Sequence, residues 1–173
     1  MIYVLAYPAF EPNTAARIRT FREMHEPDRA KLVPPHITLV FGMDDIHLAA
    51  VSERVDTVSR QARAVPVLFD RHVSAFDPFE ETHKIFLLCG DGRAEITSLH
   101  TQLYDGAHRS ELSPAHSFEP HMTVGAYRDG AALDRVDISA VGQFPIKGLV
   151  SSLELVRLDG EKLTTLRSMP LGA

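Results

Sequence analysis

Short apolar stretches alternate along this chain with segments in which apolar residues recur every three or four positions. The short stretches predict strands, at residues 2–7, 36–41, 65–75, 84–89, 121–127, 149–158 and 162–166. The other segments predict helices, which begin after residues 12–14, 44–45 and 90–92, with a shorter helix near residues 131–136. The expected class is therefore α+β, with mostly antiparallel sheets.

Turn and capping residues divide these elements. The cluster Glu26-Pro27-Asp28 is expected to end the first helix, and a loop is expected from there through Pro34-Pro35. Asp44-Asp45 is expected to cap the second helix, whose apolar positions follow a regular 3-4-3-4 spacing. A long loop is expected between residues 75 and 84, and Asp159-Gly160 predicts a tight hairpin between the last two strands.

Composition narrows the function classes. The chain has 173 residues with a formal net charge of −5, which argues against a protein that follows long stretches of nucleic-acid backbone or a DNA duplex. No stretch is long and apolar enough to span a membrane, and the first residues lack the basic region of a signal peptide. The single cysteine, Cys89, is expected to be buried and inert, and it suits a reducing compartment. These features predict a cytoplasmic protein, expected to be a monomer.

A short motif occurs twice. Pro35-His36-Ile37-Thr38 and Pro120-His121-Met122-Thr123 share the pattern Pro-His-x-Thr, and in both cases an aliphatic residue follows at the start of a predicted strand. A shuffled chain of this composition would contain about 0.03 such matches. The copies lie 85 residues apart, about half the chain, and each follows a predicted strand and helix. This repetition predicts two lobes related by a pseudo-twofold axis, the first from about Met1 to Ala64, within one domain of residues 1–173.

The residue types of the motif point to phosphoryl chemistry. Residues i and i+2 of a strand share a face, so each histidine projects together with its threonine while Ile37, Leu39, Met122 and Val124 point into the core. If the two faces meet across a cleft, two imidazoles can act as general base and general acid. The two hydroxyls can donate hydrogen bonds to phosphoryl oxygens. This scheme needs no cofactor and no metal.

These paired tetrads, His-Ile-Thr-Leu and His-Met-Thr-Val, resemble the 2H phosphoesterase superfamily, which includes the 2′-5′ RNA ligase-like proteins, or RNA 2′,3′-cyclic phosphodiesterases. The resemblance implies a bilobal fold with a central cleft, in which His36, Thr38, His121 and Thr123 are catalytic. It also implies hydrolysis of 2′,3′-cyclic phosphodiesters of RNA ends or nucleotides, and 2′-5′ ligation as the reverse reaction. Phe41 matches an aromatic residue common at that position of the family.

Three further residues are candidates for substrate binding. Lys31 lies shortly before the first motif and Arg128 after the second, so both could line the mouth of the cleft. Tyr127 shares the face of His121 by period-two counting, so it could stack on a base. Ordinary solvated charges and a closed sheet edge are the structural alternatives for these residues.

Two other functions stay open. The same site could bind a phosphorylated nucleotide without hydrolysing it, which is favoured by the absence of a basic residue directly after the second tetrad, where Gly125-Ala126-Tyr127 stands. A hydrolase with a histidine-bound metal is the second alternative function, but no known metal-ligand spacing occurs in the sequence. The histidines outside the motifs are accordingly expected to be solvated or in loops, including those at positions 72, 83, 100, 108 and 116.

Overall fold

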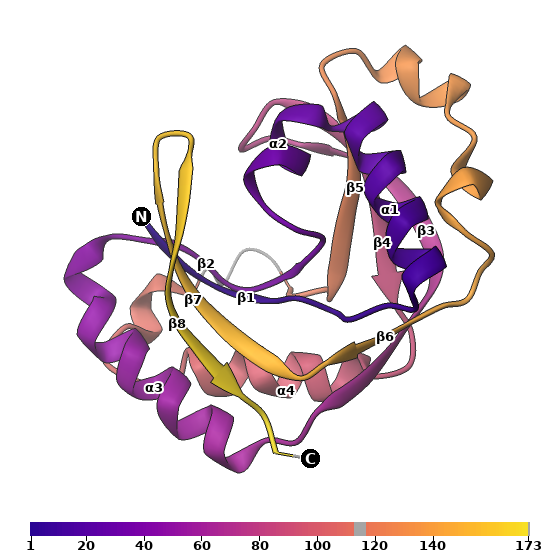
Figure 1. Cartoon of the computed structure of the whole chain (residues 1–173). Coiled ribbons are helices and arrows are strands. Elements are labelled where there is room, and N and C mark those ends of the chain that lie inside the picture. Colours follow the sequence, from indigo (N-terminus) through magenta and orange to yellow (C-terminus); the bar gives the residue numbers. More distant parts are fainter. Residues whose placement is uncertain (113–116, 173) are drawn as a thin grey trace.

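The computed structural model describes residues 1–112 and 117–172, whose strands form a pair of four-stranded antiparallel sheets (Figure 1). The first sheet has the order β2-β1-β7-β8, formed by Ile37–Met43, Ile2–Ala6, Ser152–Asp159 and Lys162–Pro170. The second has the order β5-β4-β3-β6, formed by His121–Tyr127, Thr82–Cys89, Val65–Asp77 and Ile146–Val150. The α+β class with antiparallel sheets is thus confirmed.

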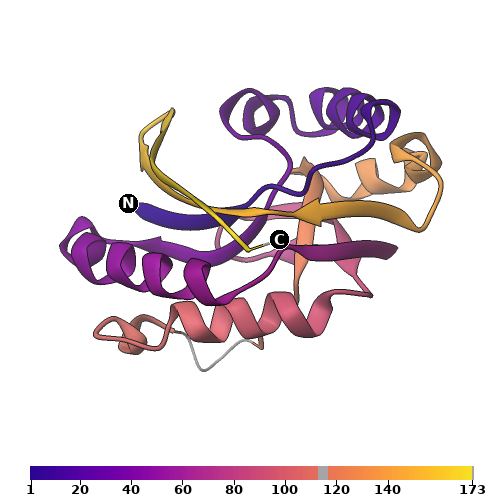
Figure 2. The same cartoon turned by 60° about the horizontal axis from the view of Figure 1, so that its bottom comes forward.

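Four α-helices cover the sheets from two sides (Figure 2). Helices α1 (Pro12–His25) and α2 (Pro27–Leu32) lie on one side, and α3 (Leu48–Gln61) and α4 (Arg93–Leu103) on the other. Four short 3₁₀ helices complete the described elements: Asp45–His47, Arg109–Glu111, Gly130–Arg135 and Ile138–Val141. A stretch of the expected polar loop from Gly106 to Pro120, including His116, lies outside the described residues.

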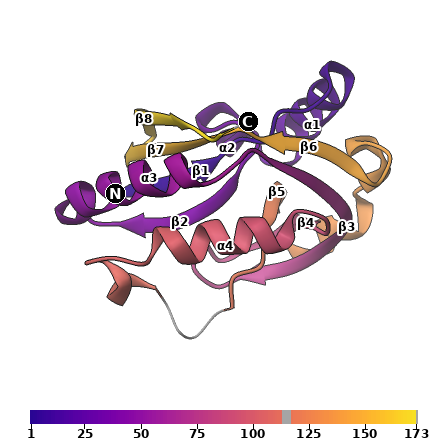
Figure 3. The same cartoon turned by 90° about the horizontal axis from the view of Figure 1, so that it is seen from below.

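Helices α1 and α4 each connect two strands of one sheet but pack against the other sheet. Helix α1 connects β1 to β2 of the first sheet but packs against β5 of the second. Helix α4 connects β4 to β5 of the second sheet but packs against β2 of the first, beside α3 (Figure 3). This reciprocal packing gives the two motif strands equivalent surroundings and joins both sheets in one hydrophobic core.

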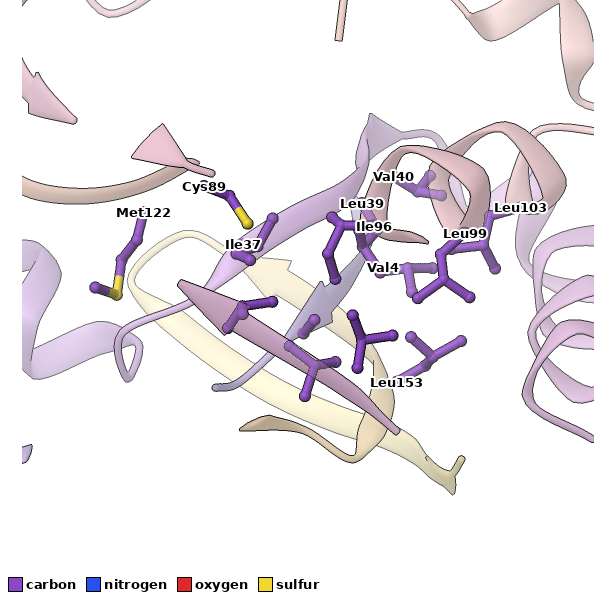
Figure 4. Packing of buried hydrophobic residues seen from close by; sticks show 14 of the residues in the cluster. Val4, Ile37, Leu39, Val40, Cys89, Ile96, Leu99, Leu103, Met122 and Leu153 are labelled. Carbon is purple, nitrogen blue, oxygen red and sulfur yellow. The ribbon is translucent and has the colours of Figure 1, made fainter. Parts of the chain in front are cut away.

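The core lies on one face of each sheet. Leu39 and Val40 of β2 meet Ile96, Leu99 and Leu103 of α4 within it (Figure 4). Each of these side chains is at most 3% exposed. At about 25 cal/mol for each Å² of apolar surface, burial of side chains this size contributes roughly 2 kcal/mol each. The opposite faces of the two sheets carry the polar members of the motifs.

Four sequence expectations about the elements were wrong. Residues 27–32 form helix α2, because Pro27 stands at the first helical position, where its missing N–H costs nothing. Asp44 and Asp45 make no side-chain cap; the Asp45 carboxylate instead lies 2.9 Å from the Arg157 guanidinium. The connection between β3 and β4 is a short turn, because both strands extend beyond the expected bounds.

The fourth error is the strand expected over residues 149–158. At Ser151 the chain passes from the second sheet to the first, so β6 pairs with β3 and β7 pairs with β1. No turn separates β6 from β7, so their apolar residues form one continuous pattern. The change of sheet could therefore not be predicted from that pattern. The hairpin at Asp159-Gly160 is confirmed, and Gly160 has the positive φ of 58° that its turn requires.

Candidate active site

The two motif histidines are held in the same way. His36 directly precedes β2 and His121 opens β5. In each ring, Nδ1–H donates to the backbone carbonyl two residues earlier, at 2.8 Å to Pro34 O and at 2.7 Å to Glu119 O. A proton held on Nδ1 leaves the Nε2 lone pair of the neutral ring free, so both imidazoles present the same nitrogen to a ligand.

The motif residues alternate as expected. Ile37, Leu39, Met122 and Val124 are fully buried in the core. Thr38 and Thr123 are only partly buried and lie on the opposite faces, in register with Leu5 of β1 and Phe86 of β4. We call these two surfaces, which carry the histidines and threonines, the motif faces.

A β-bulge follows the threonine of both motifs. Pairing in the first sheet passes from Leu5–Thr38 to Val4–Val40, and in the second sheet from Phe86–Thr123 to Ile85–Gly125. Each motif strand therefore holds one extra residue at the same place, and the side-chain alternation shifts by one position after it. The two motifs are thus alike in backbone geometry as well as in sequence.

The bulges decide where the aromatic candidates point. Phe41, which simple alternation would place with the buried Leu39, is 48% exposed. Tyr127 is turned the other way, because its hydroxyl bonds to Nδ1 of His25 on α1, on the core side of the sheet. The expectation that Tyr127 shares the face of His121 was therefore wrong, since period-two counting fails across a bulge.

The pKa of His36 is lowered to about 4, first because the ring is desolvated by burial. The hydrogen bond to Pro34 opposes this shift, while the charges of Arg22, Arg29 and His121 add to it. His121 thus lies near enough for its charge to act on His36. At neutral pH His36 is an uncharged base.

The pKa of His121 is also lowered, again first by burial. Its ring centroid lies 4.5 Å from that of Phe86. Unlike His36, it has carboxylates among its neighbours, because the charges of Glu119 and Asp77 raise its pKa while that of Lys84 lowers it. The electrostatic surroundings of His121 therefore favour a proton more than those of His36 do.

A network of buried and half-buried charges, which was not predicted from the sequence, surrounds the histidines. Arg22, which is 2% exposed, pairs with Glu26 and donates to Val33 O at 2.9 Å. Lys84, on the motif face of β4, lies 2.5 Å from Asp77 and 2.9 Å from Glu80. Arg29 of α2 also pairs with Glu80.

This network links α2 to the turn between β3 and β4. Its members are far apart in the sequence and follow no motif, and the only local signal is a charged residue within an apolar strand, as at Lys84.

Tyr7 is a further residue of the site that was not predicted from the sequence. Its ring meets His36 edge to face, with centroids 6.4 Å apart. Burial, and secondarily the charge of Glu154, raises the pKa of Tyr7 to about 12. The hydroxyl therefore stays protonated and can donate a hydrogen bond beside His36.

Lys31 and Arg128, the remaining candidates for substrate binding, are exposed. Cys89 is buried as expected, and burial raises the pKa of its thiol to about 11, which disfavours a nucleophilic thiolate. His100 was expected in solvent or a loop, but it lies buried in α4 and bonds to Leu39 O. His108 lies in a loop as expected, although it is buried, and it bonds to Leu103 O.

Neither a metal cluster nor a membrane span occurs among the described residues. In residues 1–112 and 117–172, no group of three or more His, Cys, Asp or Glu side chains could hold a metal ion. No helix in the described stretches is long and apolar enough to span a membrane.

Comparisons with known proteins agree with the fold. E. coli LigT complexed with NADP⁺ superposes with a TM-score of 0.65 at 17% identity, covering 99% of this chain and 97% of LigT. TT0787 of Thermus thermophilus gives 0.61 at 20% identity, covering 97% of each chain. Kluyveromyces marxianus Usb1 gives 0.58 at 10% identity, covering 98% of this chain and 97% of Usb1. A search of curated proteins found no significant match.

The sequence itself supplies the family. Residues 10–162 match the family model described as the 2′-5′ RNA ligase superfamily. This match covers most of the chain, and the similar structures include LigT and a protein described as a phosphoesterase. The chain therefore belongs to the 2′-5′ RNA ligase superfamily of 2H phosphoesterases.

Proposed function

We propose that the protein hydrolyses 2′,3′-cyclic phosphodiesters of RNA ends or nucleotides by acid–base catalysis with His36 and His121. One observation carries this proposal: both motifs repeat the same Nδ1 anchor and the same bulge after the threonine. Two equivalent imidazoles acting on one phosphate are the arrangement that in-line displacement needs. Solved LigT structures contain phosphate and 3′-AMP, which supports a nucleotide phosphate as the ligand class.

The surroundings of the two rings support different roles for them. His36, with its pKa near 4 and cations around it, is the general base that takes a proton from the attacking water through Nε2. His121, which has Glu119 and Asp77 nearby, is the general acid. The charge of a bound phosphodiester further favours its protonated form, because an anion raises the pKa of a neighbouring imidazole.

The reaction then balances without a cofactor. The water oxygen bonds to phosphorus, one ester P–O bond of the ring breaks, and His121 protonates the departing ribose oxygen, leaving a phosphomonoester. Thr38 and Thr123 donate hydrogen bonds to the non-bridging oxygens as charge develops there. A ribose 5′-hydroxyl in place of water gives 2′-5′ ligation, with the 3′ oxygen as the leaving group.

Hydrolysis of a 2′,3′-cyclic mononucleotide by wild type and by His36→Ala and His121→Ala tests this function. Each variant should lose about 10²- to 10⁴-fold in rate, because a proton-transfer partner is gone. Both should still bind the phosphomonoester product, because the hydroxyls of Thr38 and Thr123 and the remaining imidazole still contact its phosphate. A wild type that binds the product but never hydrolyses the substrate would instead make the protein a nucleotide-binding module.

The same assay tests the alternative hypothesis that the protein is a metal-dependent hydrolase. We expect full activity after dialysis against a chelator. Loss of activity in chelator with recovery in zinc or manganese would contradict the two-histidine scheme.

The acid and base roles are separable with an aryl cyclic phosphate, whose phenolate leaves with less need of a proton. On this substrate, His121→Ala should recover most of its activity, whereas His36→Ala should not. Recovery by His36→Ala alone would reverse the assignment.

A further inference from the structure

A groove of about 510 Å³ lies beside His36, and neither motif histidine nor motif threonine belongs to its lining. Its walls come from the connection between β1 and α1, from one side of α1, and from α2 with the segment that follows it. The lining combines apolar residues, among them Phe10 and Pro35, with three cations, Arg19, Arg22 and Lys31.

The groove is positive on a chain whose net charge is −5. No carboxylate belongs to its lining among the described residues. The charge of Arg22 is balanced by Glu26, but Arg19 and Lys31 are exposed, and neither has an ion-pair partner within residues 1–112 and 117–172. Two uncompensated cations in one groove are the chemistry that binds a phosphate chain.

The groove adjoins the proposed catalytic centre directly. Pro34, a lining residue, supplies the carbonyl that holds Nδ1 of His36. Tyr7, also a lining residue, packs edge to face against the His36 ring. A chain that lies in the groove therefore has its end within reach of His36.

Apolar walls beside the cations favour a nucleotide chain over a simple anion. Phe10 is partly buried and rests against Phe69, with ring centroids 6.2 Å apart, so its position is fixed. Aromatic and proline surfaces offer flat contacts for the sugars and bases of a single strand, while cations follow its backbone.

We propose that this groove binds the nucleotides upstream of a 2′,3′-cyclic end, with Arg19 and Lys31 contacting their phosphates. This inference rests on the proposed function and adds the portion of the substrate that the motif faces do not hold.

Kinetics with two substrates test it: a 2′,3′-cyclic mononucleotide and a trinucleotide with the same cyclic end. The variant is Arg19→Gln with Lys31→Gln, and the matched control is Arg17→Gln with Lys162→Gln, which removes two exposed charges outside the groove. On a single strand, two phosphate contacts contribute about 25-fold to affinity between 1 M and 0.1 M salt. The groove variant should thus raise KM for the trinucleotide roughly 25-fold at 0.1 M salt and flatten its salt dependence.

The mononucleotide should be hydrolysed equally by wild type, groove variant and control. Equal losses on both substrates, or an unchanged KM for the trinucleotide, would overturn the groove assignment while leaving the phosphodiesterase function intact. If wild type hydrolyses neither substrate, the proposed function fails. In that case the proposed role of the groove is tested by the affinity for a trinucleotide with a terminal phosphate. Equal affinities of the groove variant and wild type would refute that role.

Discussion

The lowered pKa of His36 predicts that the enzyme keeps its activity at a lower pH than an enzyme with an ordinary histidine as general base. An ordinary histidine has a pKa of 6.5, whereas burial and neighbouring cations lower the pKa of His36 to about 4. This difference corresponds to roughly 300-fold weaker proton binding. At pH 5.5 a histidine with the ordinary pKa would be only about 9% neutral, whereas His36 would be about 97% neutral. The general base should therefore stay active well below neutrality.

The assay is kcat/KM for a 2′,3′-cyclic mononucleotide from pH 4 to pH 9, because this ratio reports the groups of the free enzyme. The pKa of His121 is also lowered, so its protonated form is lost before neutral pH and the optimum should lie on the acid side of neutrality. The two apparent pKa values belong to the pair, since the charge of His121 acts on His36. An acid limb with its midpoint near 6.5 would refute this assignment of the base.

Three further outcomes follow from the same structure. Thr38→Val and Thr123→Val should each cost about 10²- to 10³-fold in kcat while the pH profile stays unchanged, as measured by hydrolysis over the full pH range. Met122→Ala should lower the free energy of unfolding by about 2–5 kcal/mol in urea titrations, because it leaves a cavity at a fully buried position. Stability should fall as the pH drops from about 6.5 to 4, because the unfolded chain binds a proton that His36 does not bind in the folded state. In thermal melts His36→Asn should lessen this fall.

The repeated motif was a strong predictor because its chemistry is local. A histidine and a threonine two positions apart on a strand must share a face, and the burial of Ile37 and Met122 bears out the alternation. The strand His121–Tyr127 was predicted with the bounds that the structure has. These features depend only on neighbouring residues.

Features that depend on distant residues were missed. The bulge after Thr123, which turns Tyr127 toward α1, was missed because a bulge is defined by the partner strand. Gly125 within the strand is its only local sign. The passage from one sheet to the other at Ser151 was missed for the same reason, because only the pairing of β6 with β3 and of β7 with β1 distinguishes these two strands. The ion pairs of Lys84 likewise form with residues that only the β3–β4 turn brings close.

A crystal structure with the phosphomonoester product bound tests the central claim most directly. We expect one phosphate held by Nε2 of both His36 and His121, with the hydroxyls of Thr38 and Thr123 on its remaining oxygens. A product phosphate bound elsewhere, or contacted by only one of the two imidazoles, would contradict the two-histidine mechanism.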